Sequence, residues 1–293
     1  MDKFPVLSIY QFDDDGKEHE FHINTFSEHL LKHHTNVLIP HKHDFYLTVL
    51  FTKGSGWHEI DFKRHAVAPG SLFFLHPGQT HHWEFTPDVE GVIFFHSLTF
   101  FQLNCPQQAL GEFPFYSTRQ QEQMLQLDRE RSVHFEQRLT GILEEYQSRQ
   151  LFRYSKISSL VNTFYIDVAR TWPAGLFRHG TEPSGYVQRF RQFEALIEEH
   201  FRSEKSASAY AERMNISAKH LNRISKECCG LTSTEVITER VLLEAKRLLS
   251  HQEFNLNEIA FTLGFEEYAY FSRLFKKHTG ETPHEFRKKY RAG

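Results

Sequence analysis

The second half of the chain contains an internal repeat, and this feature constrains the fold more than any other. Residues 217–226 (SAKHLNRISK) align with residues 267–276 (EYAYFSRLFK) at a separation of 50 residues. The segment GLTS at 230–233 then aligns with GETP at 280–283. Each copy is predicted to form a helix, a tight turn, a second helix and a glycine stop. This is the outline of a helix-turn-helix.

The second helix of each copy is predicted to have a core face and an outer face. Side chains three and four positions apart fall on the same side of a helix. The predicted core positions are Leu221, Ile224, Ser225, Phe271, Leu274 and Phe275. The opposite faces carry Lys219, Asn222, Arg223 and Lys226 in the first copy and Ala269, Ser272, Arg273 and Lys276 in the second.

The residue types on the outer faces suit the base edges and phosphates of DNA. Arginine binds guanine through two hydrogen bonds, asparagine binds adenine in the same way, and alanine leaves room for a thymine methyl group. One such face alone is most simply a solvated basic surface. Two faces in the same phase, each preceded by a helix and a turn, favour DNA binding.

The charge of the whole chain argues against nucleic acid, but its distribution does not. The formal net charge is −3 and the pI is near 6.7, whereas nucleic-acid-binding domains are commonly basic. From Tyr186 onward there are 18 Lys and Arg against 15 Asp and Glu, and the preceding residues carry 16 against 22. We therefore expect two parts with different functions, the second of them mildly basic.

The first part is predicted to begin with strands and to continue with helices. Short β-rich runs separated by Gly and Pro-Gly turns are typical of a β-sandwich or barrel. These runs occupy residues 45–51, 57–62, 71–75 and 92–96. After Pro106 the apolar residues recur at helical spacing, which predicts two amphipathic helices. Their apolar positions are Phe135, Leu139, Ile142, Leu143 and Tyr146, then Ile157, Leu160, Val161, Phe164, Tyr165 and Val168.

Several motifs of the second half together resemble the signature of AraC/XylS-type transcription regulators. The resemblance covers residues 186–290 and rests on AKRLL at 245–249, NEIA at 257–260, LGF at 263–265, YFSRLFKK at 270–277, GETP at 280–283 and the pair Phe286-Arg287. It implies two helix-turn-helix units joined by a long helix over residues 234–249. The two recognition helices would enter successive major grooves on one face of DNA, about 34 Å apart.

The resemblance also implies roles for individual residues. The positions that match base-reading residues of the family are Lys219, Asn222 and Arg223 in the first unit and Tyr268, Ala269, Ser272 and Arg273 in the second. Lys226, Lys276 and Lys277 are assigned to phosphates, which position a protein on DNA without specifying sequence. Two positions depart from the family pattern. Asn215 occupies the turn of the first unit, and Ser225 stands where a large apolar or aromatic residue is more frequent.

The first half resembles the two cupin motifs as they occur in sensor domains of the same regulator family. HKH at 41–43 and PGQTH at 77–81 carry this resemblance. Cupin enzymes hold a divalent metal with two histidines and a carboxylate from the first motif and one histidine from the second. Here the expected glutamate position is Leu47. A metal held by His41, His43 and His81 would therefore be short of one ligand; this alternative stays open, and no cofactor is assigned. We expect instead a mostly apolar effector pocket with a few polar groups, lined by His41, His43, Tyr46, His81 and Trp83.

The other histidines of the first part are expected on strand surfaces or as hydrogen-bonded core residues. They are His58, His65, His76, His82 and His96. The three cysteines, Cys105, Cys228 and Cys229, are too few for a disulfide framework and are read as buried thiols in a reducing compartment.

The expected fold class is a β domain followed by an α domain. An N-terminal cupin-like β-barrel with flanking helices would precede an all-α domain with two helix-turn-helix units. Residues 1–105 form the predicted effector-sensing domain and residues 106–172 a helical region. Residues 173–185, rich in Pro and Gly, form a linker, and residues 186–293 form the DNA-binding domain. We prefer a dimerisation role for the helical region over a simple cover for the barrel.

The expected function is a ligand-responsive, sequence-specific DNA-binding transcription regulator, an activator and not an enzyme. Its expected partners are double-stranded DNA, a small-molecule effector, RNA polymerase and a second copy of the chain. A cytoplasmic location without a membrane partner is expected, since there is no run of 18 apolar residues and no signal-peptide pattern.

Two alternatives remain open at this point. The first is a cupin metalloenzyme of the dioxygenase or isomerase type with a helical appendage, against which Leu47 and the C-terminal motifs count. The second is a constitutive DNA-binding scaffold with a vestigial barrel.

Overall fold

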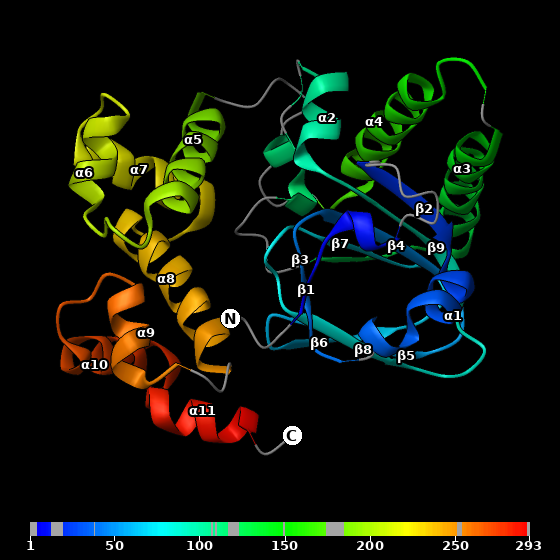
Figure 1. The fold of residues 1–293 in the computed structure, drawn as a ribbon. Coiled ribbons are helices and arrows are strands. Elements are labelled where there is room, and N and C mark those ends of the chain that lie inside the picture. The colour runs from blue at the N-terminus through cyan, green and yellow to red at the C-terminus, as the bar shows by residue number, and fades with distance from the viewer. Residues whose placement is uncertain are drawn as a thin grey trace. The chain divides into compact units, whose positions relative to one another are not determined.

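A computed structural model describes most of the chain as two compact units. The described residues are 5–12, 20–37, 39–106, 108, 110–116, 123–148, 150–173, 185–250 and 254–291. The units comprise residues 2–173 and residues 174–293. The first is β-rich and the second is entirely helical in its described part (Figure 1). The predicted order of a β domain followed by an α domain is therefore confirmed.

The strands of the first unit lie in a five-stranded, a three-stranded and a two-stranded sheet. The antiparallel five-stranded sheet has the order β10 (Met124–Gln126), β7 (Ser71–Leu75), β4 (Tyr46–Lys53), β9 (Glu90–His96) and β2 (Phe21–Thr25). The three-stranded sheet has the order β6 (Lys63–Val67), β5 (Gly56–Ile60) and β8 (His81–Phe85). The two-stranded sheet pairs β1 (Val6–Leu7) with β3 (Lys42–His43). Within the described residues these sheets do not close into a barrel, so the cupin-like barrel stays a prediction.

The five-stranded sheet is buried on both faces. One face packs against α3 (Arg129–Ser148) and α4 (Arg153–Thr171), and the other packs toward the three-stranded sheet (Figure 1). Side chains of β4 alternate between the two cores, with Val49 in one and Leu50 in the other. The two helices predicted from apolar spacing are thus present, and they cover the sheet. The unit also contains helices α1 (Phe26–Val37) and α2 (Leu98–Asn104) and short 3-10 turns at Ile9–Phe12, Leu110–Glu112 and Pro114–Tyr116.

A buried hydrogen-bond chain fixes α4 on the sheet. The Nδ1 atom of His96 donates to the carbonyl of Ser97 at 2.8 Å, so its Nε2 accepts from the Tyr165 hydroxyl at 2.8 Å. The Tyr116 hydroxyl lies 2.8 Å from that of Tyr165, and Thr48 Oγ1 lies 3.2 Å from Tyr116. His96 is therefore a hydrogen-bonded core histidine.

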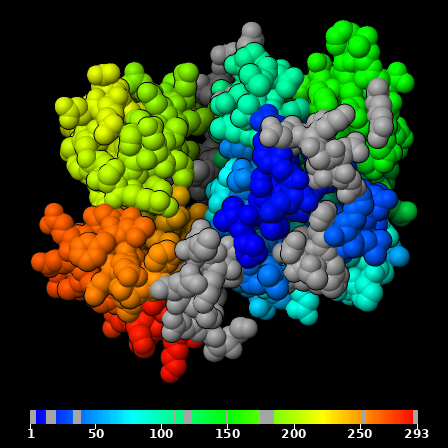
Figure 2. Space-filling model, in the orientation of Figure 1, coloured from blue at the N-terminus to red at the C-terminus, as the bar shows by residue number. Residues whose placement is uncertain are grey.

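The helical unit contains a short helix, a tight turn and a longer helix twice. The first set is α6 (Ala207–Arg213) and α7 (Ala218–Cys229), and the second is α9 (Leu256–Thr262) and α10 (Tyr268–Thr279). Helix α8 (Ser233–Ser250) joins them, and α5 (Gly185–His200) and α11 (Pro283–Arg291) complete the unit. The lobe of α6 and α7 (yellow-green) and the lobe of α9 and α10 (orange) are neighbours in Figure 2. No helix of the described ranges is long and apolar enough to cross a membrane.

The turn of each copy depends on one residue in the left-handed region. Gly264 has a φ of +75°, and a Cβ atom there would lie 1.9 Å from the carbonyl oxygen of Arg202. Asn215 takes the corresponding position in the first copy with a φ of 53°. Asparagine tolerates this conformation better than other non-glycine residues, which explains the first departure from the family pattern.

The second departure, Ser225, also has a physical explanation. Its side chain is fully buried in α7, and its hydroxyl donates to the carbonyl of Leu221 at 3.0 Å. The small residue therefore satisfies its own polar group inside the core without a partner from another helix.

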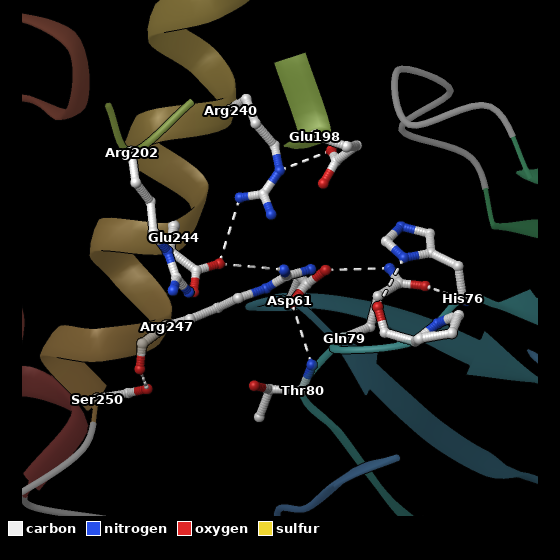
Figure 3. Close-up of polar contacts among 11 residues, drawn as sticks. Asp61, His76, Gln79, Thr80, Glu198, Arg202, Arg240, Glu244, Arg247 and Ser250 are labelled. Carbon is white, nitrogen blue, oxygen red and sulfur yellow. Dashed lines mark hydrogen bonds and ion pairs between the residues drawn. The ribbon is translucent and has the colours of Figure 1, made fainter. Parts of the chain in front are cut away.

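Ion pairs anchor the connecting helix α8 to α5 and to Arg202, which follows α5. Arg240 Nε binds Glu198 at 2.7 Å, and Arg240 Nη1 binds Glu244 at 3.2 Å. Glu244 also pairs with Arg202 at 3.0 Å and with Arg247 at 3.5 Å (Figure 3). The Arg240 guanidinium stacks on the Phe201 ring at 3.9 Å. These contacts hold the helix from which both halves of the unit extend.

We predict that Gly264→Ala destabilises the helical unit by more than about 2 kcal/mol, because it adds a left-handed strain of about 1–2 kcal/mol to a steric clash. Asn215→Ala adds only the strain and should cost about 1 kcal/mol. The measurement is the urea midpoint of each full-length variant. Equal midpoints for Gly264→Ala and Asn215→Ala would contradict the close approach at Gly264.

Candidate functional site

Helix α10 presents the predicted DNA-binding residues of the second copy on one side. Phe271 and Phe275 are fully buried on the core side. The outer residues Ala269, Arg273, Lys276 and Lys277 are exposed, while Tyr268 and Ser272 are half-buried. Arg273 has no hydrogen-bond or ion-pair partner within the described ranges. Its guanidinium is therefore available for a contact outside the described residues.

Helix α7 presents a similar face, but Asn222 and Arg223 already have hydrogen-bond partners within the helical unit. Lys219, Arg223 and Lys226 are exposed and Asn222 is half-buried. The Asn222 side-chain carbonyl accepts the N–H of Ser233, the first residue of α8, at 3.2 Å. A two-bond contact with adenine needs this carbonyl as well as the amide group. The carbonyl oxygen keeps a second lone pair, so the bond to Ser233 orients the Asn222 side chain without by itself excluding such a contact.

Matching caps extend the repeat beyond α7 and α10. The N–H and hydroxyl of Thr232 both donate to Glu235 at 2.7 Å, and those of Thr282 donate to Glu285 at 2.7 and 2.8 Å. The backbone hydrogen bond in each cap lowers the pKa of the glutamate, and the hydroxyl hydrogen bond adds to it. The caps thus start α8 after α7 and α11 after α10 in the same way.

In the β-rich unit, four of the five predicted effector residues form one buried cluster. Backbone hydrogen bonds of 3.0 Å in both directions join His41 to His81. The His81 ring centroid lies 4.2 Å from that of His41, 5.0 Å from that of His43 and 5.1 Å from that of Trp83. All four side chains are at most 2% exposed.

Tyr46, the fifth predicted residue, lies on the other face of the five-stranded sheet. Its ring stacks on His96 at 5.5 Å and contacts Tyr116 at 5.0 Å. It packs against the core beneath α3 and α4. It is therefore not part of the histidine cluster.

The structure adds His58, which sequence reasoning placed among surface or core histidines. Strand β5 pairs with β8 so that His58 is opposite Trp83. His58 Nε2 lies 2.9 Å from His81 Nδ1, and the side chain is fully buried. Only the pairing of β5 with β8 brings His58 to the cluster, and the spacing of residues along the chain does not show which residues lie opposite each other. We call His41, His43, His58, His81 and Trp83 the histidine cluster.

The backbone fixes the tautomers of two rings in this cluster. The Nδ1 atoms of His41 and His43 lie 2.8 Å from the carbonyls of Ile39 and Phe45. Because a carbonyl only accepts, each Nδ1 carries the hydrogen and each Nε2 carries a lone pair. Within the described residues, four buried polar atoms of the cluster have no hydrogen-bond partner: His43 Nε2, His58 Nδ1, His81 Nε2 and Trp83 Nε1.

Burial keeps these imidazoles neutral. It lowers the pKa of His41 to about 4 and that of His43 to about 3, and it lowers the pKa of His58 and His81 well below the ordinary value. Neighbouring imidazoles lower each pKa further. At neutral pH the cluster therefore offers lone pairs and N–H groups but no charge.

The loop before β8 is held by the turn between β5 and β6. The carboxylate of Asp61 accepts from Gln79 Nε2 at 3.0 Å and from the Thr80 N–H at 3.2 Å (Figure 3). Gln79 Oε1 in turn accepts the N–H of His76 at 2.9 Å. These contacts fix the residues directly before His81.

The nitrogen atoms of the histidine cluster are not arranged as ligands of a resident metal. In the part of the chain that the structure describes, no group of three or more His, Cys, Asp or Glu side chains has an arrangement that could hold a metal ion. Leu47, at the expected carboxylate position, is 3% exposed and packs in the apolar core. The cluster is therefore treated as a hydrogen-bonding site.

We predict that the β-rich unit loses stability as the pH falls below about 6.5, because the unfolded chain then binds protons that the buried rings exclude. His43 alone contributes a loss of about 2 kcal/mol between pH 7 and pH 5. Urea midpoints of the wild type and of His43→Gln over this range test the prediction. The variant should show the shallower fall, and parallel profiles would contradict it.

Comparisons with known proteins agree with this two-unit organisation. Residues 210–289 match the model of a helix-turn-helix domain, and residues 28–161 match that of an AraC-like ligand binding domain. The HTH-type transcriptional activator RhaS of Escherichia fergusonii is 26% identical over 255 residues, covering 84% of this chain and 86% of that protein. RhaS of Enterobacter sp. strain 638 is 26% identical over 259 residues, with the same coverage of both chains.

Similar solved structures include ToxT of Vibrio cholerae and a domain of a response regulator. ToxT is 14% identical and covers 92% of this chain and 98% of its own, with a TM-score of 0.45. The C-terminal domain of the response regulator yesN of Fusobacterium nucleatum is 28% identical. The match covers 34% of this chain and 98% of that domain, with a TM-score of 0.33.

Proposed function

The chain belongs to the AraC/XylS-type transcription regulators with an N-terminal sensor domain, and we propose that its two recognition helices read successive major grooves of DNA. It is a ligand-responsive, sequence-specific DNA-binding regulator, homologous to transcriptional activators. The single observation that supports the proposal is the repeated helix, left-handed turn and helix. The outer faces of α7 and α10 carry basic residues at matching positions.

The proposed base-reading residues are Lys219 and Arg223 on α7 and Tyr268, Ala269, Ser272 and Arg273 on α10. Asn222 is assigned to the same face, where its carbonyl also accepts a hydrogen bond from the start of α8. The last turns of the two helices carry the exposed residues Lys226, Lys276 and Lys277, which we assign to phosphates.

Arg273→Ala should weaken binding to a fragment selected from genomic DNA by about 1–3 kcal/mol, because one arginine–guanine contact is lost. Arg223→Ala should have a similar effect at the other half-site. Titration of full-length variants against wild-type and point-changed fragments measures both effects. Lys226→Ala is the control, because loss of a phosphate contact lowers affinity for all sequences alike. Unchanged binding by the double variant Arg223→Ala, Arg273→Ala would contradict the assignment of these helices to the grooves.

For the first unit, we propose that the histidine cluster binds the effector. Buried polar atoms without partners are unfavourable, so a ligand that supplies hydrogen bonds to them would be favoured. The lone pair on His43 Nε2 requires a donor such as a hydroxyl or N–H group. Tyr46 was predicted for this site, but it lies on the opposite face of the sheet and is left out of the proposal.

Effector binding changes DNA affinity only if the ligand has different affinities for two arrangements of the protein. His43→Leu removes the lone pair and should reduce the response to fractionated metabolite pools about tenfold, the equivalent of one buried hydrogen bond. The measurement is affinity for the selected DNA fragment with and without each pool. Tyr46→Phe is the matched control and should retain the response. A response that survives His43→Leu would exclude the cluster, and no response in the wild type would favour the constitutive scaffold.

We further propose a cytoplasmic homodimer that acts on RNA polymerase as an activator. Helices α3 and α4 cover the sheet with their apolar faces, yet Leu151 and Phe152 between them are 82% and 74% exposed. This exposed apolar pair supports a dimerisation role for the helical region. The alternative, a cupin metalloenzyme, has less support because Leu47 belongs to the apolar core.

A further inference from the structure

Three side chains from two helices form a cluster at the end of the helical unit where α5 begins. Tyr186, the second residue of α5, lies with its ring 5.5 Å from the guanidinium carbon of Arg223 on α7. The Nη2 atom of Arg223 donates to His220 Nδ1 at 2.9 Å. The His220 ring in turn meets the Tyr186 ring edge-on, with centroids 5.5 Å apart. Each of the three residues thus contacts the other two.

The equivalent arginine of the second copy has no such support. Arg273 aligns with Arg223, but it has no polar partner in the described part of the chain. Tyr270 aligns with His220, and its ring contacts Phe265 at 5.9 Å rather than an arginine. Helix α8 precedes the α9–α10 copy as α5 precedes α6 and α7, but within the described residues no aromatic ring is stacked on Arg273. The two recognition helices therefore hold their shared arginine differently.

An aromatic face attracts a guanidinium through its quadrupole. A hydrogen bond to a neutral imidazole nitrogen then sets the rotation of the planar group. An arginine held in this way loses less side-chain entropy when it binds a base, since part of its freedom is already lost. A contact with a guanine edge uses two of the five N–H donors of the guanidinium. The remaining donors are enough to keep the hydrogen bond to His220.

We propose that Tyr186 is a positioning residue for DNA reading, which together with His220 orients Arg223 toward the base edges of the first half-site. The inference rests on the proposed function of α7. It extends the specificity determinants beyond the recognition helices to the first turn of α5. The base preference of the first half-site depends on Tyr186, and that of the second half-site does not.

The test is selection of bound duplexes from a randomised library by full-length variants, followed by affinity measurement on the selected duplex and its single-base changes. Arg223→Ala and Arg273→Ala first define the base positions read by each helix. Tyr186→Ala should then reduce discrimination about twofold to fivefold at the positions that Arg223→Ala affects. It should leave the positions affected by Arg273→Ala unchanged. Tyr186→Phe keeps the ring face and should restore the preference.

The double variant Tyr186→Ala, Arg223→Ala separates positioning from a general structural effect. If Tyr186 acts through Arg223, the double variant should show the preference of Arg223→Ala alone. If Tyr186→Ala lowers the thermal midpoint, His220→Leu removes the other contact to Arg223 and should cause the same selective loss.

The outcomes distinguish the inference from the function on which it rests. A wild-type protein that selects no sequence would overturn the proposed function. A wild type that selects a sequence while Tyr186→Ala leaves discrimination intact, or lowers it equally at both half-sites, would overturn only the positioning role. Additive effects of Tyr186→Ala and Arg223→Ala would overturn it as well.

Discussion

The left-handed residue between the two helices of each copy is the constraint on which the helical unit depends. At Gly264 the chain passes so close to the carbonyl of Arg202 that no side chain fits, and Asn215 makes the same reversal in the first copy. Each reversal turns the apolar side of the following helix into the core and leaves its basic side exposed. Helix α8 carries one such arrangement at each end, and its ion pairs to Glu198 of α5 and to Arg202, which follows α5, keep it in place.

The β-rich unit is organised around a different constraint, the satisfaction of buried polar groups. On one face of the five-stranded sheet, Thr48, Tyr116, Tyr165 and His96 satisfy one another in a continuous chain. On the other face, the histidine cluster keeps four polar atoms without partners in the described residues. A folded protein rarely leaves such groups unsatisfied without a functional reason. The gathering of four such atoms in one cluster supports the proposed effector site.

The sequence predicted those features that depend on local spacing. The repeat located α7 and α10. Its 3.6-residue period predicted that Arg223 and Arg273 are exposed, because the side of a helix on which a residue lies follows from its spacing to the apolar residues. It did not predict that Asn222 bonds the start of α8 or that Arg223 contacts Tyr186, since these partners lie on other helices. The histidine cluster shows the same limit. His41, His43 and His81 were found from motifs, whereas the inclusion of His58 and the exclusion of Tyr46 follow from strand pairing and sheet orientation.

The central claim, that α7 and α10 read successive major grooves on one face of DNA, is tested most directly by methylation interference at guanine N7. The full-length protein would be bound to a fragment that it selects from genomic DNA. Two clusters of interfering guanines are expected, separated by about 10–10.5 base pairs and therefore on the same face of the duplex. One cluster alone, or two clusters on opposite faces, would contradict the claim.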